Sequence, residues 1–135
     1  MINAMKNLKS SLSEAQEQSN LIAWVDNCIE LKIHPELRNL YAVPNGGTRN
    51  KIEAANLKRQ GVRAGVPDLC LAWPKGKYCG LYLEMKVHPN RTTDEQESWL
   101  KSLSSAGYAV KVCYGAKAAK ATLEAYLKLG DYKCS

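Results

Sequence analysis

Apolar residues recur along the chain at two spacings, which separate predicted helices from predicted strands. Between residues 13 and 32 they return every three or four positions, the spacing of an amphipathic helix. Between residues 81 and 87 they alternate with polar residues, the spacing of a strand. These patterns predict helices at about residues 13–32, 49–60, 92–107 and 116–129, and strands at about 39–43, 66–73, 78–87 and 108–114. The order αβαββαβα favours an α/β fold in which helices flank a mixed sheet of about four strands.

Capping and turn residues indicate where the predicted helices begin and end. Ser11 or Ser13 fits the start of the first helix, and Thr92 or Thr93 the start of the third, because each is followed three residues later by Glu or Gln. Pro35 ends the first helix, since the residue before a proline is pushed out of the helical region.

The third predicted strand carries two charges where apolar side chains are the rule. Its apolar face holds Leu81, Leu83, Met85 and Val87. Its other face holds Tyr82, Glu84 and Lys86. A charged residue in mid-strand gives up the roughly 1.5–3 kcal/mol that burying an apolar side chain provides. We therefore expect Glu84 and Lys86 to serve a function, namely to bind a metal ion and to act on a reacting phosphate.

Asp68 opens the second predicted strand, which a short turn joins to the third. In an antiparallel hairpin the Asp68 and Glu84 carboxylates converge, and the Met85 carbonyl supplies a third oxygen for Mg²⁺ or Mn²⁺. One or two such ions neutralise a phosphate and activate a water molecule. Lys86 either orients or deprotonates that water or counters the charge on the phosphate, and the sequence leaves these roles open. The alternative is an ordinary cross-strand ion pair worth about 0.2–1 kcal/mol.

Composition favours a cytoplasmic globular domain. The chain has 135 residues, enough for one domain, with 45% hydrophobic and 24% charged residues. No apolar run approaches the roughly 18 residues of a membrane span, and the first eleven residues hold no apolar signal region, so we expect no membrane partner. The five cysteines contain no C-x-x-C pair, which favours buried thiols over a zinc site.

The formal net charge of +6 favours a polyanionic partner, and nucleic acid is the natural candidate. Five basic residues gather ahead of Asp68, in and after the second predicted helix: Arg49, Lys51, Lys58, Arg59 and Arg63. We expect them to bind DNA phosphates on either side of the reacting phosphate. The alternative is a basic helix face that only keeps the protein in solution.

Pro67-Asp68 and Glu84-x-Lys86 resemble the two halves of the PD-(D/E)xK nuclease motif. The surrounding segments extend the resemblance to the VRR-NUC domain, in particular its small stand-alone phage and bacterial members. These segments are A-V-P-N-G-G at residues 42–47, G-V-R-A-G-V-P-D at 61–68, L-Y-L-E-M-K at 81–86 and G-Y-A-V at 107–110. The resemblance covers about residues 13–129 and implies a restriction-endonuclease-like fold, in a single nuclease domain over residues 1–135.

The resemblance also implies roles for residues on the helices. In that family a glutamate on the first helix joins the metal site, and the Ser13-Glu14-Ala15-Gln16 segment assigns this role to Glu14, with Glu17 as the competitor one turn on. Gln18 falls in the same register, and Gln96 matches a family glutamine after the third strand. We expect both to lie beside the metal ligands. The alternative for Glu14 is a solvated carboxylate at a helix start, and for Gln96 it is helix capping.

By the same resemblance, the activity is that of an endonuclease that requires one or two Mg²⁺ or Mn²⁺ ions and cuts structured or branched DNA. Similar proteins are Holliday-junction resolvases of bacterial or phage-infected cells, which nick two symmetric strands, so we expect a homodimer. No small-molecule cofactor is expected. Two alternatives stay open: a nuclease that cuts flap, nicked or linear duplex DNA, and a DNA-binding module without catalysis.

Overall fold

The computed structural model describes residues 12–44 and 50–134. Its helices are α2 (Glu14–Glu30), α3 (Lys51–Arg59), α4 (Asp94–Ser105) and α5 (Ala116–Leu127), with a 3₁₀ helix η1 (Pro35–Asn39). Its strands are β1 (Leu40–Ala42), β2 (Leu69–Leu71), β3 (Leu81–Lys86) and β4 (Ala109–Tyr114). The predicted order of helices and strands is confirmed, and η1 is an addition that the sequence patterns did not predict.

The first two strands are shorter than predicted, three residues each. Pro35 starts η1, which takes the residues leading into β1. Pro67 lacks the N–H that a ladder requires, so β2 begins only after Asp68. Asp68 consequently lies just before β2 and not within it, although its backbone carbonyl accepts a hydrogen bond from the Val43 N–H at 2.8 Å.

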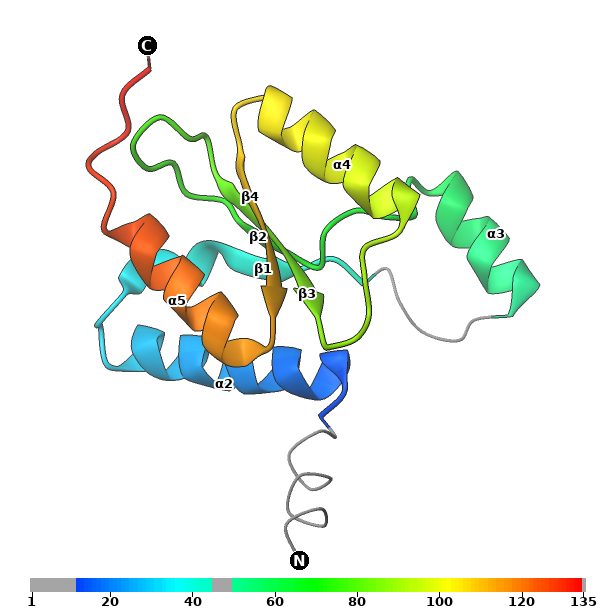
Figure 1. The fold of residues 1–135 in the computed structure, drawn as a ribbon, viewed down its shortest axis with the longest axis horizontal. Helices are drawn as coiled ribbons and strands as arrows, with labels where there is room; N and C mark the ends of the chain where they lie inside the picture. The colour runs from blue at the N-terminus through cyan, green and yellow to red at the C-terminus, as the bar shows by residue number, and fades with distance from the viewer. Residues whose placement is uncertain (1–11, 45–49, 135) are drawn as a thin grey trace, which may run out of the picture.

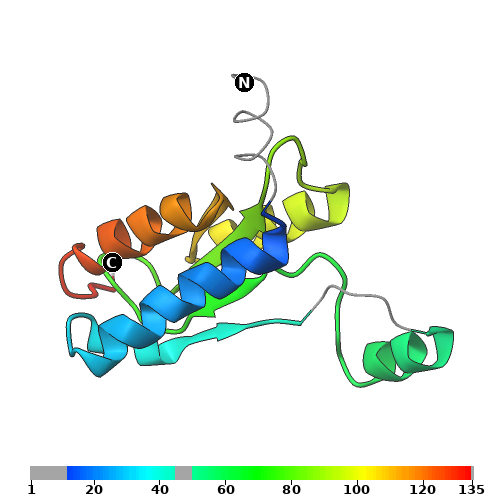
Figure 2. The ribbon, with the colours of Figure 1, turned by 90° about the horizontal axis from the view of Figure 1, so that it is seen from below.

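The four strands form one mixed sheet in the order β1-β2-β3-β4. β1 pairs with β2 and β2 with β3 in antiparallel fashion, so the predicted hairpin is confirmed. β4 pairs with β3 in parallel, which places Val112 beside Glu84 and Tyr114 beside Lys86. Helices α2 and α5 lie side by side on one face of the sheet, and α4 lies on the other (Figures 1 and 2).

The core lies between the sheet and the α2/α5 layer. Leucines of β2 and β3 pack there against Leu21 and Val25 of α2 and Leu123 of α5, and all are at most 3% exposed. Each such side chain contributes about 1.5–3 kcal/mol on leaving water. This layer fixes β3 in place, so the opposite face of β3 is free to carry chemistry.

The charged face of β3 is itself buried. Glu84 is 2% exposed and Lys86 is 7% exposed, and Gln96 of α4 contacts Glu84 from this side of the sheet. The sequence pattern predicted the alternation of side chains, but it did not predict that both charges would be shielded from water.

Helix α3 lies apart from the sheet (Figures 1 and 2), and none of its residues is buried. Asn50 caps its start by accepting a hydrogen bond from the Glu53 N–H at 2.8 Å. The chain then returns to β2 past the first turn of α4, where Gly65 has φ +86° and a Cβ at this position would lie 2.8 Å from the Glu95 backbone. The Trp99 indole fastens the same loop by donating to the Ala64 carbonyl at 3.0 Å.

None of the helices in the described parts of the chain is both long and apolar enough to cross a membrane.

Candidate active site

Asp68, Glu84 and Lys86 come together at the ends of β2 and β3. The Met85 backbone N–H donates to Asp68 Oδ2 at 2.7 Å, which holds the carboxylate against β3. On the same strand, Lys86 Nζ lies 3.8 Å from Glu84 Oε1. The antiparallel register thus joins the two halves of the motif, as the sequence predicts for a hairpin.

Glu84 is held from α4 by Gln96. The Gln96 side-chain amide donates to Glu84 Oε1 at 2.8 Å, while its oxygen accepts from the Thr93 N–H at 2.9 Å. Gln96 therefore both caps α4 and contacts the site, so the two roles considered for it coexist. The other carboxylate oxygen, Glu84 Oε2, is buried, and no hydrogen-bond partner for it exists among the described residues. A buried carboxylate oxygen without a partner is costly and requires a reason.

Burial and the repulsion between neighbouring carboxylates both oppose the ionisation of Glu84 and Asp68. Burial, followed by repulsion from Asp68, raises the pKa of Glu84 from 4.5 to about 8, against the opposing effect of Lys86. Burial also raises the pKa of Asp68, although the Met85 N–H opposes the rise, and the Glu14 carboxylate adds to it. Two carboxyl groups in contact in a low-dielectric site require either a proton or a cation between them.

The donor set fits a hard divalent cation. Mg²⁺ prefers oxygen ligands, keeps several water molecules, and is commonly bound through one or two carboxylates. Asp68 and Glu84 provide two, and Glu84 Oε2 is a buried acceptor that no protein group uses among the described residues. Within residues 12–44 and 50–134, no three acidic, histidine or cysteine side chains converge on one ion position as they stand. The fit therefore rests on the carboxylate pair.

Of the two candidate glutamates on α2, Glu14 is the one that faces the site. It lines the same cleft as Asp68, and Glu14 Oε1 accepts a hydrogen bond from the Asn90 side chain at 3.2 Å. Glu17 is engaged elsewhere, because its Oε2 accepts from the Ala116 N–H at 2.8 Å at the start of α5. A carboxylate at a helix N-terminus satisfies free N–H groups, so Glu17 has a structural role.

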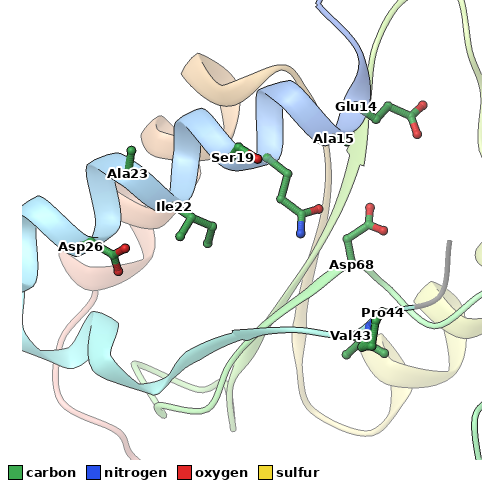
Figure 3. A pocket seen from close by; sticks show the side chains of 10 residues that line it. Glu14, Ala15, Ser19, Ile22, Ala23, Asp26, Val43, Pro44 and Asp68 are labelled. Carbon is green, nitrogen blue, oxygen red and sulfur yellow. The ribbon is translucent and has the colours of Figure 1, made fainter. Parts of the chain in front are cut away.

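A cleft of about 770 Å³ runs along α2 from this site, and we call it the α2 cleft. Figure 3 shows Glu14 and Asp68 at one end and Asp26 at the other, with Val43 and Pro44 across from the helix. Gln18, one helical turn on from Glu14, also lines the cleft, and its predicted place beside the metal ligands stays a prediction.

A model of the VRR-NUC domain matches residues 8–117 of the chain. The chain belongs to the VRR-NUC family. A solved structure described as a VRR_NUC domain protein resembles it with a TM-score of 0.76 and 28% sequence identity, over 92% of this chain and 95% of that chain. This likeness confirms the restriction-endonuclease-like α/β fold. A search of curated proteins found no match.

Membership of the VRR-NUC family makes this chain a nuclease domain and implies DNA as its substrate. The basic residues of this VRR-NUC chain lie outside the cluster of carboxylates. Lys51, Lys58 and Arg59 are on α3 and Arg63 is on the loop that follows, and all four are exposed. Arg59 donates to the Asn56 side chain. Arg49, the fifth residue of the predicted set, lies outside the described residues.

Sequence reasoning missed two residues beside the candidate site of this VRR-NUC chain, Asn90 and Tyr114. The Tyr114 hydroxyl donates to the Asn90 carbonyl at 2.9 Å, and Asn90 in turn donates to Glu14. The His88 ring stacks on Tyr114 with centroids 4.2 Å apart. Asn90 lies in a loop without periodicity, so no local pattern indicated it. Knowing that β4 pairs with β3 in parallel, which sets Tyr114 beside Lys86, would have pointed to Tyr114.

Proposed function

We propose that this VRR-NUC domain is a metal-dependent endonuclease that hydrolyses phosphodiester bonds in branched DNA, as a Holliday-junction resolvase does. The observation that carries the proposal is the contact of Asp68 with the β3 strand that bears Glu84, together with the unpartnered, buried oxygen of Glu84. A protein that only binds DNA gains nothing from burying carboxylates that repel phosphate.

One or two Mg²⁺ or Mn²⁺ ions would be held by Asp68, Glu84, the Met85 carbonyl and Glu14. When bound, the ion neutralises charge on the phosphate and lowers the pKa of a bound water. Gln96 donates to one oxygen of Glu84 and leaves the other, buried oxygen without a hydrogen bond from the described residues. Asn90 holds Glu14 at the edge of the site.

Lys86 acts on the reacting groups from the same face of β3. Its ammonium is 3.8 Å from Glu84 Oε1, so a water molecule or a phosphate oxygen beside Glu84 lies within its reach. In that position it either orients or deprotonates the attacking water or stabilises the charge that grows on the phosphate. Its burial strengthens each of these interactions, because the surrounding dielectric is low.

The exposed basic residues of α3 and the following loop would bind the DNA backbone. These are Lys51, Lys58, Arg59 and Arg63, and Arg49 lies next to them in the sequence. Contacts of this kind position the backbone without reading bases. A branched substrate with two symmetric cutting sites is presented most simply by two copies of the chain, so we propose a homodimer.

The test is cleavage of a panel of four-way junction, flap, nicked, linear duplex and single-stranded DNA with and without Mg²⁺. Wild-type protein should cut the junction best and only with a divalent ion. Asp68→Asn, Glu84→Gln and Lys86→Ala should each lower the rate by at least about a hundredfold, which corresponds to about 2.7 kcal/mol of barrier. Glu30→Gln, an exposed change at the far end of α2, should leave the rate unchanged.

Each other outcome indicates a different function for the protein. Best cleavage of flap, nicked or linear DNA would keep the nuclease and replace its substrate. Binding without cleavage in any divalent ion, or cleavage that survives all three substitutions, would contradict the proposed active site. Light scattering of the free protein and of its junction complex gives the number of subunits.

A further inference from the structure

The α2 cleft is continuous with the carboxylate site but differs from it in chemistry. Beyond Glu14 and Asp68 it passes Gln18, Ser19 and Ile22 and ends at Asp26 (Figure 3). The opposite wall includes Val43. The cleft thus offers apolar walls together with an amide, a hydroxyl and a carboxylate.

The charge of the cleft excludes the phosphate backbone as its occupant. Glu14 and Asp68 lie at the end of the cleft where the cation is proposed to bind, and beyond them the lining holds the Asp26 carboxylate and, among the described residues, no lysine or arginine. A phosphate deep in the cleft would meet uncompensated negative charge. Lys51, Lys58 and Arg59, which suit phosphates, are on α3, and α3 lies apart from the sheet (Figure 1).

We propose that the α2 cleft receives a nucleobase of the substrate strand, unstacked from its neighbours and adjacent to the cleaved phosphate. This inference rests on the proposed nuclease function, because it takes the carboxylate site as the place of cleavage. A base is uncharged, and it has flat apolar faces that match Ile22 and Val43. Its edge carries donors and acceptors that match Asp26, Ser19 and Gln18.

The base pocket would explain how the enzyme selects structured DNA. Drawing a base out of a duplex costs a few kcal/mol, and the cost is least for a nucleotide that is already unpaired. Branch points supply such nucleotides and continuous duplex does not. The Asp26 carboxylate accepts hydrogen bonds, so it favours cytosine, adenine or guanine, whose exocyclic amino groups donate. Thymine is disfavoured because its one ring N–H lies between two carbonyl oxygens that a carboxylate repels.

The test uses 2-aminopurine, whose fluorescence rises when the base leaves the stack, placed in turn at each nucleotide flanking the mapped cut. The protein is mixed with DNA in Ca²⁺, and a gel confirms that the DNA stays intact. Wild-type protein should raise the fluorescence at one flanking position. It should not raise it at a paired position about ten nucleotides away, roughly one helical turn. Ala23→Trp, which fills the cleft from an exposed position on α2, should abolish the rise. Ala125→Trp, the same change at an exposed position on α5, should preserve it.

Cleavage provides the second readout. Ala23→Trp should slow junction cutting at least about tenfold while its Tm stays within a few degrees of wild type. Asp26→Ala should reduce the preference for cytosine, adenine or guanine over thymine by about tenfold. That is the discrimination expected of one good hydrogen-bonded pair. The base pocket is refuted if wild-type protein cuts junctions without a rise in fluorescence, or if Ala23→Trp matches wild type in both readouts. If wild-type protein cuts no DNA, the proposed function fails instead.

Discussion

At the scale of single residues, the candidate site consists of the two motif carboxylates, the Glu14 carboxylate and the groups that hold them. Met85, Gln96 and Asn90 each donate a hydrogen bond to one carboxylate, those of Asp68, Glu84 and Glu14 respectively. Groups that orient metal ligands in this way typically change metal affinity by about 10–100-fold when they are removed. The hydrogen bond from Asn90 can be tested apart from the motif.

Asn90→Ala should weaken Mn²⁺ binding about tenfold, because Glu14 loses the donor that holds it at the edge of the site. The measurement is calorimetric titration of Mn²⁺ into the protein. Asn27→Ala, an exposed asparagine on α2, should bind Mn²⁺ like wild type. Equal Mn²⁺ affinities for wild type, Asn90→Ala and Asn27→Ala would show that the hydrogen bond from Asn90 to Glu14 does not support metal binding.

The sequence indicated Glu84 and Lys86 because two charges interrupt an apolar strand, and Asp68 because a short turn joins it to that strand. Their proximity is confirmed, while their catalytic roles stay predictions. Choosing between Glu14 and Glu17 required the structure, since only the contact between Glu17 and the start of α5 shows that Glu17 is engaged elsewhere. Asn90 was beyond prediction, because its role depends on a loop that brings residues 14 and 90 together.

At the scale of elements, the loop from α3 to β2 is set by glycines. Gly61 and Gly65 both have positive φ, but only Gly65 also packs against backbone atoms, those of Glu95 at the start of α4. This loop contains Arg63 and leads directly to Pro67-Asp68. Its path therefore determines where the first carboxylate of the motif lies.

Gly65→Ala should lower the free energy of unfolding by about 3 kcal/mol or more, because an alanine there is strained and also meets Glu95 at 2.8 Å. Gly61→Ala should cost only about 1 kcal/mol, since it has the unfavourable φ but nothing within 4 Å. Urea unfolding of the two variants gives the difference. Equal losses would mean that the close packing against α4 contributes nothing.

Helix α3 has no buried residues, and its charged face is available to DNA. The double change Lys58→Ala with Arg59→Ala should reduce the slope of log affinity against log salt by about 2, because each phosphate that the protein no longer neutralises lowers the slope by about one. Fluorescence anisotropy with a labelled junction measures that slope. Lys128→Ala, at the exposed end of α5, is the charge control and should reduce it by much less. An unchanged slope in the double variant would contradict the assignment of α3 to DNA binding.

The predicted elements show what local sequence determines. Capping boxes at Ser13 and Thr93 are confirmed, and the helices they start begin within one or two residues of the prediction. The strands β1 and β2 were predicted too long, because the length of a strand depends on how many residues its partner can pair, and that is not a local property.

At the scale of the whole molecule, a hydrophobic layer on one face of the sheet supports two buried charges on the other. The order of elements was predictable from sequence, whereas the parallel pairing of β3 with β4 and the covering of Glu84 by α4 depend on contacts distant in sequence. The buried carboxylates oppose folding when they are ionised and unpaired, which has a measurable effect on stability.

Without divalent ions, the protein should become less stable as the pH rises from about 5 to about 8. The pKa of Glu84 is raised from 4.5 to about 8, so in this range the folded state binds more protons than the unfolded state, and stability falls with pH. The raised pKa of Asp68 acts in the same direction. Thermal unfolding in EDTA measures the trend, which Glu84→Gln should flatten. A wild-type Tm that rises over this range would contradict the buried, protonated pair.

We propose that Asp68 and Glu84 together hold a divalent cation. Calorimetric titration of Mn²⁺ into wild-type, Asp68→Asn and Glu84→Gln proteins tests this, with Glu30→Gln as the surface control. We predict that wild type and the control bind Mn²⁺ with equal affinity and that each carboxylate variant binds at least about tenfold more weakly while remaining folded. Failure of wild type to bind Mn²⁺, or undiminished binding by both carboxylate variants, would contradict the account.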